Sequence, residues 1–213
     1  MVIGRPRIVI ADDHRLVLEA LQNLLEPHYE VVGTASEGLS LLQIAPSLKP
    51  DIIIVDLIMP LLSGLESGLR LKSLMPAIKL IFLTMNDDPE IARKAMREGA
   101  SAYLLKSSAP QELFDAIRVI LKGGTYVTPL MAKAIEEVFI RNPEGRDTKQ
   151  LTLRQREVVQ LLAEGKSMKE AAAILKVTPR TIAFHKYTVM ERLGVKTTAK
   201  LIQFAIQNHI LVA

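Results

Sequence analysis

The sequence contains no cysteine among its 213 residues. This absence excludes a disulfide framework, a thiol nucleophile and a thiolate metal site. Apolar runs are also short, and none reaches the roughly 18 residues that a membrane-spanning helix needs. The first residues lead directly into an apolar strand pattern, without the hydrophobic region of a secretory signal. We therefore expect a soluble, cytoplasmic protein that makes no membrane contact.

Charge is distributed unevenly along the chain. Residues 1–127 contain 13 Lys or Arg against 15 Asp or Glu, a net charge of −2, whereas residues 151–213 contain 10 against 4, a net charge of +6. The contrast indicates two domains, of which the basic one is the candidate for nucleic-acid binding. Residues 128–150 begin with a helical pattern and continue into a polar stretch with Pro and Gly, which predicts a linker helix followed by a flexible connection.

Five strand patterns alternate with helical patterns in the first domain. The run Ile-Ile-Ile-Val at residues 52–55 is the clearest of them. Continuous β-branched runs are typical of strands buried on both faces of a parallel sheet. The alternation predicts a doubly wound, flavodoxin-like sheet of five parallel strands with right-handed crossovers.

Polar residues stand where four of these strands end. They are the acidic pair Asp12 and Asp13, then Asp56, Thr84 and Lys106. Ligands bind beyond the carboxyl ends of the strands in open α/β sheets, so we expect these groups to share one rim. Clustered carboxylates repel one another at neutral pH, so we expect a divalent cation among them. Mg²⁺ binds through one or two carboxylates and keeps several of its waters. A lysine and a hydroxyl beside such an ion would complete a cradle for a phosphoryl group.

The second domain has only helical patterns. Thr152 and Ser167 each precede Gln or Glu by three residues, which is the signature of a capping box. Thr178 stands before Pro179 and predicts the start of a third helix, and a fourth follows from Thr197 or Thr198. A short helix, a turn near residue 177 and a second helix match a helix-turn-helix unit within an all-α, four-helix domain.

Together these motifs resemble the NarL/FixJ-type two-component response regulators over nearly the whole chain. The residues that resemble a receiver domain are Asp12, Asp13, the stretch 56–60, Gly64, Thr84, Tyr103 and Lys106. The residues that resemble a LuxR-type helix-turn-helix are Leu151, Thr152, Arg154, Glu157, Gly165, Ser167, Lys169, Glu170, Thr181, His185 and Leu193. The resemblance implies a receiver domain over residues 1–127, a linker over 128–150 and a DNA-binding domain over 151–213.

The resemblance also implies a role for each rim residue. Asp56 would accept a phosphoryl group from a sensor histidine kinase in the presence of Mg²⁺. Asp13, Asp56 and the backbone carbonyl of Ile58 would bind the ion directly, and Asp12 would act largely through water. Such a protein is not an enzyme in the ordinary sense, because it catalyses only its own phosphorylation and dephosphorylation.

Three further receiver residues would sense the phosphoryl group. Lys106 would contact its oxygens, and Thr84 would bond to them after transfer. Tyr103 would change its packing as Thr84 moves, altering the face formed by the helices over residues 87–99 and 110–122. The alternative interpretation of Tyr103 is a half-buried strand tyrosine with a hydrated hydroxyl.

On the helix predicted over residues 179–193, an apolar stripe of Ile182, Val189 and Leu193 should face the domain core. The opposite side would enter the major groove of duplex DNA. The candidate contact residues are Lys176, Arg180, Thr181, Ala183, Phe184, His185, Lys186 and Tyr187. The basic ones and Thr181 suit phosphates, whereas Ala183, Phe184 and Tyr187 suit base edges and thymine methyls. Alternatively, Phe184 packs on a neighbouring helix. His185 is expected to be packed or to touch phosphate rather than to bind a metal.

The helix predicted over residues 198–208 contains Leu201, Ile202, Ala205 and Ile206, which is more apolar surface than a terminal helix needs for its own core. We therefore expect a homodimer on DNA that uses this helix, with RNA polymerase as a further candidate partner. In the unphosphorylated state we expect the receiver to hold or cover the recognition helix through the flexible linker over residues 141–150.

An aspartyl phosphatase would place its nucleophile after the first strand in an Asp-x-Asp pattern, whereas Asp12 and Asp13 are adjacent. A flavin-binding protein would need a phosphate-binding loop after that strand, where these two acidic residues would repel phosphate. A DNA-binding protein with an unphosphorylated receiver is a third alternative, disfavoured by the complete rim.

Overall fold

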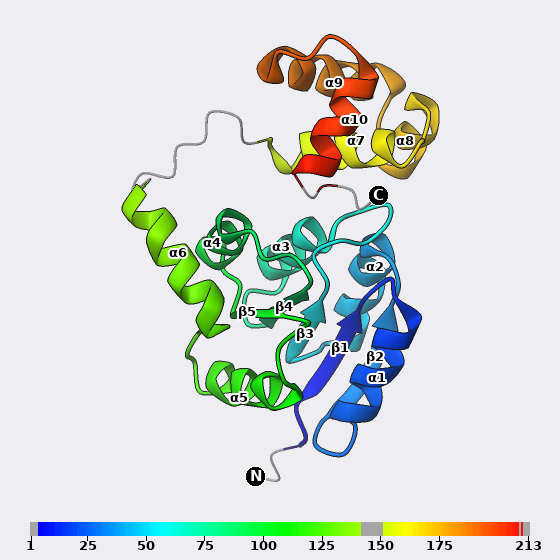
Figure 1. The fold of residues 1–213 in the computed structure, drawn as a ribbon. Coiled ribbons are helices and arrows are strands. Elements are labelled where there is room, and N and C mark those ends of the chain that lie inside the picture. The colour runs from blue at the N-terminus through cyan, green and yellow to red at the C-terminus, as the bar shows by residue number, and fades with distance from the viewer. Residues whose placement is uncertain (1–3, 142–150, 209, 211–213) are drawn as a thin grey trace.

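The structure is a computed structural model that describes residues 4–141, 151–208 and 210. Its N-terminal domain is built on a parallel sheet with strand order β2-β1-β3-β4-β5-β6 (Figure 1). The strands are β1 (Arg7–Ala11), β2 (Glu30–Ala35), β3 (Ile52–Val55), β4 (Lys79–Thr84), β5 (Ala102–Leu105) and β6 (Tyr126–Val127). The five predicted strands are confirmed. The sixth pairs with β5 at the sheet edge and is too short to produce a periodic pattern.

Helices cover both faces of this sheet. The connecting helices are α1 (Arg15–Leu25), α2 (Gly38–Leu48), α3 (Gly64–Leu74), α4 (Pro89–Arg97) and α5 (Pro110–Leu121). Buried residues of α2, α3 and α4 share one hydrophobic cluster, and those of α1 and α5 share the other. All four residues of β3 are buried between the two clusters, because the strand lies at the centre of a sheet covered on both sides.

The helix α6 (Pro129–Arg141) follows the sheet and lies beside α4 (Figure 1). Met131 is buried in the same cluster as α2, α3 and α4, so the start of the linker region packs onto the receiver-like domain. Thr128, just before α6, donates its amide to the carbonyl of Tyr103 in β5 at 3.1 Å. The predicted flexible connection falls at residues 142–150, outside the described residues.

The C-terminal domain consists of α7 (Leu153–Ala163), α8 (Met168–Ile174), α9 (Pro179–Leu193) and α10 (Thr198–Gln207). Both predicted capping boxes are confirmed: Thr152 pairs with Gln155, and Ser167 pairs with Glu170. The chain turns between α8 and α9 at Lys176, whose φ is 53°. Across the described part of the chain, no helix is both long and apolar enough to cross a membrane.

Candidate functional site

The predicted polar rim forms at the carboxyl ends of the strands. Asp12 follows β1, and Asp56 follows its neighbour β3; they are 1% and 6% exposed. The backbone fixes their spacing, because the amide of Asp56 donates to the carbonyl of Ala11 at 2.9 Å. On the next strands, Lys106 donates its amide to the carbonyl of Thr84 at 2.8 Å. The sheet register therefore brings the four strand ends to one edge.

The Lys106 ammonium bridges the two buried carboxylates. Its Nζ lies 2.6 Å from Asp12 Oδ2 and 2.7 Å from Asp56 Oδ2. Burial acts to lower the pKa of Lys106, but the hydrogen bonds to Asp12 and Asp56 outweigh burial and raise it. Two buried carboxylates without a cation would be costly, so Lys106 compensates charge that the fold has removed from water.

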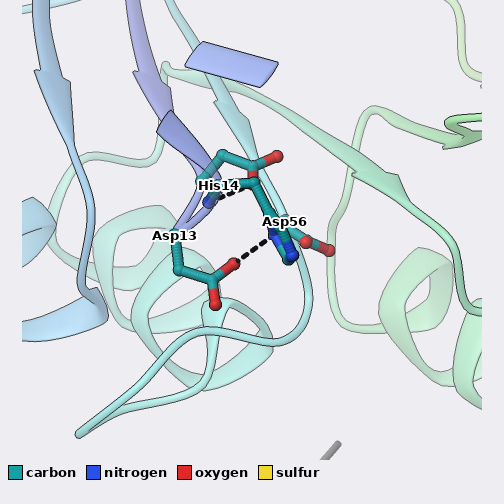
Figure 2. Close-up of side chains that lie close together, drawn as sticks. Asp13, His14 and Asp56 are labelled. Atoms are coloured by element: carbon teal, nitrogen blue, oxygen red, sulfur yellow. Dashed lines mark hydrogen bonds and ion pairs between the residues drawn. The ribbon is translucent and has the colours of Figure 1, made fainter. Parts of the chain in front are cut away.

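Asp13 and His14 complete the polar cluster on its exposed side (Figure 2). Nδ1 of His14 lies 2.9 Å from Asp13 Oδ1, and one potential ligand atom from each of Asp12, Asp13, His14 and Asp56 falls within 4.8 Å of the others. Three carboxylates suit a hard cation such as Mg²⁺, so the donor set fits the predicted ion. No role for His14 was predicted from the sequence, although it directly follows the acidic pair.

Gly64 explains why the loop after Asp56 can close. A Cβ at this position would lie 1.6 Å from the backbone oxygen of Asp56. The Gly64 amide also donates to the carbonyl of Leu57 at 2.9 Å. Only glycine permits this close backbone approach, so the rim geometry depends on a residue that contributes no side chain.

The two candidate switch residues are joined through Asn86. The hydroxyl of Tyr103 donates to the Asn86 carbonyl at 2.8 Å, and the Thr84 hydroxyl accepts from the Asn86 amide at 3.1 Å. Tyr103 is fully buried, and burial, followed by the charge of Asp88, raises its pKa. The alternative of a half-buried tyrosine with a hydrated hydroxyl is therefore wrong. Asn86 was missed because its link to Tyr103 is made by a backbone carbonyl.

The candidate recognition helix α9 has the predicted two sides. Ile182 and Val189 are fully buried, whereas Phe184 and Tyr187 are 66% and 59% exposed. Phe184 makes an edge contact with the ring of His185 but is not packed beneath a neighbouring helix. The alternative in which Phe184 packs on a neighbouring helix is wrong, and the outer face of α9 presents aromatic side chains to solvent.

The remaining candidate DNA contacts differ in their surroundings. Lys176 and Arg180 are exposed, while the Thr181 hydroxyl lies 2.9 Å from that of Thr178 at the helix start. Nζ of Lys186 lies 5.6 Å from the centre of the Tyr187 ring. Ala183 lies on the same helix, half-buried.

His185 is packed rather than exposed for metal binding. Its Nδ1 is buried, and burial, followed by the charge of Arg154, lowers its pKa. The burial of Nδ1 agrees with the expectation that His185 is packed.

The receiver-like domain contacts α7 and not the outer face of α9. Gln160 Nε2 donates to the Met59 carbonyl at 2.6 Å, and the Leu61 amide donates to the Glu164 carboxylate at 3.2 Å. The Leu61 side chain packs against the core cluster formed by α7, α8 and α9. The expectation that the receiver covers the recognition helix is therefore wrong for the outer face of α9 in this structure, because the polar groups that match the loop after β3 are on α7.

Charged residues extend the same contact along α3. Arg70 forms an ion pair with Glu157, and Arg156 Nε lies 3.4 Å from Glu66 Oε1. Glu66 is fully buried, and neither of its carboxylate oxygens has a hydrogen-bond partner among the described residues. Burial raises the pKa of Glu66 to about 8, against the lowering effect of Arg156. The contact between the domains thus encloses a carboxyl group that resists ionisation.

Only part of the apolar surface of α10 is free for a partner. Leu201 and Ala205 are buried in the core of their own domain, whereas Ile206 is 39% exposed. The predicted dimer contact rested on Leu201, Ile202, Ala205 and Ile206 giving this helix more apolar surface than its own core needs. The burial of Leu201 and Ala205 reduces that surplus, because a four-helix domain of this size needs the inner face of its last helix for its own core.

Family models match both domains. Residues 8–118 match the response regulator receiver domain, and residues 149–205 match the bacterial regulatory proteins of the luxR family. Similar curated proteins include the oxygen regulatory protein NreC of Staphylococcus carnosus (strain TM300), which is 34% identical over 96% of this chain and 99% of its own length. NreC of Staphylococcus aureus (strain JH9) is 35% identical with the same coverage.

Solved structures of RcsB from Salmonella are similar across both domains. One structure of the Salmonella typhimurium RcsB response regulator has a TM-score of 0.68 and 28% identity, covering 95% of this chain and 97% of that chain. RcsB of Salmonella enterica serovar Typhimurium, bound to promoter rprA in the presence of phosphomimetic BeF3-, has a TM-score of 0.67 and 29% identity, with 94% and 98% covered.

Proposed function

The chain belongs to the response regulators that join a receiver domain to a luxR-family DNA-binding domain, and it regulates transcription; we propose that Mg²⁺-dependent phosphorylation of Asp56 controls this activity. The observation that carries the proposal is the bridge between buried Asp12 and Asp56 through Lys106. The ammonium that contacts the phosphoacceptor can contact phosphoryl oxygens instead once the acceptor is phosphorylated.

The phosphoryl group would come from a phosphohistidine of a sensor kinase. The P–N bond breaks as an oxygen of the Asp56 carboxylate forms a P–O bond, and the histidine nitrogen takes up a proton. Asp13, Asp56 and the Ile58 carbonyl would hold Mg²⁺, with Asp12 acting largely through water. When bound, the ion supplies positive charge against the transferring oxygens. Thr84 then donates its hydroxyl to the new phosphoryl oxygens, a change that Tyr103 and Asn86 would relay to α4.

The proposed output is sequence-specific binding of duplex DNA by a homodimer. Lys176, Arg180 and Lys186 would contact phosphates, while Phe184 and Tyr187 would reach base edges in the major groove. Exposed Ile206 is the part of α10 that a second copy would cover. RNA polymerase remains the further candidate partner, and the cytoplasm the proposed location.

The same proposal assigns a function to each part of the chain. Residues 1–127 form the phosphoacceptor domain, residues 128–150 the linker and residues 151–213 the DNA-binding domain. The packing of Met131 against the receiver core supports a linker helix that moves with the receiver. Phosphorylation would then change dimerisation and DNA affinity through a shift between two arrangements of the domains.

The test is phosphoryl incorporation from a small phosphodonor such as acetyl phosphate, measured by intact-protein mass spectrometry. The wild-type chain should gain one phosphoryl group only with Mg²⁺, and Asp56→Asn should gain none. In Asp13→Asn, Mg²⁺ should no longer stimulate phosphorylation, because the substitution removes a direct ligand of the ion. Catalytic hydrolysis of a phosphate ester such as p-nitrophenyl phosphate would instead favour a phosphatase, and equal labelling of Asp56→Asn would overturn the assignment.

A further inference from the structure

A small cavity lies between the two domains beside the acidic cluster. Its volume is about 150 Å³, and it is lined by Asp13, Ile58, Met59, Pro60, Gln160, Glu164 and Ile210. Asp13 belongs both to this cavity and to the cluster of potential metal ligands. The cavity therefore opens onto the proposed metal site from the side of the DNA-binding domain.

Gln160 brings an unsatisfied acceptor to this cavity. The residue is 1% exposed, and its Oε1 has no hydrogen-bond partner among the described residues. Its Nε2 donates to the Met59 carbonyl at 2.6 Å and to Glu164 at 2.8 Å. Rotating the amide would place an oxygen against the Met59 carbonyl oxygen, so these contacts fix the orientation. A buried acceptor in this position calls for a hydrogen-bond donor.

Glu164 also lines the cavity, where it supplies a second hydrogen-bond acceptor and a negative charge. Its two carboxylate oxygens accept from the Leu61 amide at 3.2 and 3.3 Å, which leaves further lone pairs on both. Leu61 has a φ of 64°, a left-handed conformation that costs energy for a residue with a branched side chain. The contact with Glu164 and the burial of Leu61 against the other domain offset that cost and hold the loop that carries Ile58.

The missing donor matches the chemistry of a hydrated magnesium ion. Mg²⁺ keeps several of its waters when proteins bind it, and metal-bound waters are strong hydrogen-bond donors. A water takes up roughly 30 Å³ in the liquid, so the cavity has room for several. We propose that Gln160 and Glu164 of the DNA-binding domain accept hydrogen bonds from the waters of Mg²⁺ bound at Asp13 and Asp56, so that one domain completes the metal site of the other. The inference rests on the proposed metal site of the receiver.

Two consequences follow for this chain. The affinity for Mg²⁺ depends on residues of the other domain, which lie more than a hundred positions after the receiver's ligands in the sequence. Binding of the ion also strengthens the contact between the domains, because coupling between two equilibria is reciprocal. Gln160 and Glu164 are positioning residues in this scheme, since they act through water and through the loop around Ile58.

The experiment is titration of the full-length protein with Mg²⁺ by isothermal calorimetry at constant ionic strength. Gln160→Ala removes the unsatisfied acceptor, and Glu164→Gln removes the charge while keeping the size and an oxygen for the Leu61 amide. Each should raise the Kd for Mg²⁺ by about tenfold, as loss of outer hydrogen-bond partners does in other metal sites. Glu191→Gln, exposed on α9, makes the same charge change away from the cavity and should leave the Kd unchanged.

Asp13→Asn separates the two proposals. If it abolishes Mg²⁺ binding while Gln160→Ala and Glu164→Gln bind like wild type, the metal site stands and the inference about the second domain is overturned. If Asp13→Asn also binds Mg²⁺ like wild type, the proposed metal site itself fails. Equal weakening by Glu164→Gln and Glu191→Gln would reduce the effect to overall charge and would likewise overturn the inference.

Discussion

The rim of the sheet and the outer face of α9 handle charge in opposite ways. Asp12, Asp56 and Lys106 are largely buried, and each is paired with another member of the group. Lys176 and Arg180 are exposed to solvent. A site for a small phosphoryl group gains strength from low dielectric and fixed geometry, whereas a surface for a polyanion gains it from many mobile charges. Substitutions should therefore affect folding at the rim and affect only binding on α9.

The largest expected effect is at Lys106. Lys106→Met would leave Asp12 and Asp56 buried without their cation, which should lower the free energy of unfolding by about 3 kcal/mol without Mg²⁺. Adding Mg²⁺ should recover much of this loss, because a cation again offsets the carboxylates. Urea denaturation with and without the ion measures both. Lys133→Met, an exposed position on α6, is the control and should change neither value. An unchanged stability of Lys106→Met would contradict the idea that the rim depends on internal charge pairing.

The next effect is a dependence of domain docking on pH through Glu66. The groups that face Glu66 are Arg70 of α3, Lys94 of α4, and Arg156 and Glu157 of α7. Its pKa is about 8 when enclosed, against an ordinary 4.5. Docking should be strongest below the ordinary pKa and should weaken as pH rises through 8, because the ionised carboxylate resists burial. Between those values the docking equilibrium should change by at most about tenfold per pH unit.

Because the chain has no cysteine, two spin labels can report this docking without background. Gln43 and Glu191 are both exposed and lie in different domains. Spin labels at Gln43→Cys and Glu191→Cys give a distribution of distances between the domains by double electron–electron resonance spectroscopy. The distribution should broaden from pH 6 to pH 8.5. Glu66→Gln should keep it narrow at both values, since the amide carries no charge. A wild-type distribution that does not respond to pH would show that Glu66 keeps one protonation state.

A smaller effect is expected on the exposed side of α9. Arg180→Ala should weaken binding to all DNA sequences alike and make the slope of log affinity against log salt less steep by about one. Fluorescence anisotropy at several salt concentrations measures the slope. The free energy of unfolding should stay within about 0.5 kcal/mol of wild type, as for other exposed positions. Arg15→Ala, exposed on α1, is the control for the lost charge. A large loss of stability in Arg180→Ala would remove the contrast with the rim.

The smallest effect separates two neighbours on the same helix. Tyr187→Ala should reduce discrimination between DNA sequences by about 1 kcal/mol, because it removes a side chain placed to reach base edges. Lys186→Ala should instead weaken every sequence similarly. Binding to a selected site and to single-base variants of it measures the difference. If both substitutions lower all affinities by the same factor, Tyr187 contributes contact area without reading sequence.

The sequence predicted the rim more completely than the surface of α10. Strand ends can be located from apolar runs, and parallel strands bring their carboxyl ends to one edge of the sheet. The sequence alone therefore predicts that Asp12, Asp56 and Lys106 lie close together. The surplus of apolar residues on α10 could not be interpreted in the same way. A helix pattern tells which face is apolar, but not whether the partner of that face is the domain itself or a second copy.

The sequence by itself determined the two domains, the alternation of strands and helices, the capped helix starts and the groups that converge at the rim. Each of these follows from local periodicity or from residues a few positions apart. Only the tertiary structure decided that the receiver contacts α7 and that Leu61 packs against the core of the second domain. It also decided that Gln160 and Glu164 line the same cavity as Asp13. Contacts between side chains about a hundred residues apart depend on the shapes of two finished surfaces, and no local pattern in the chain encodes them.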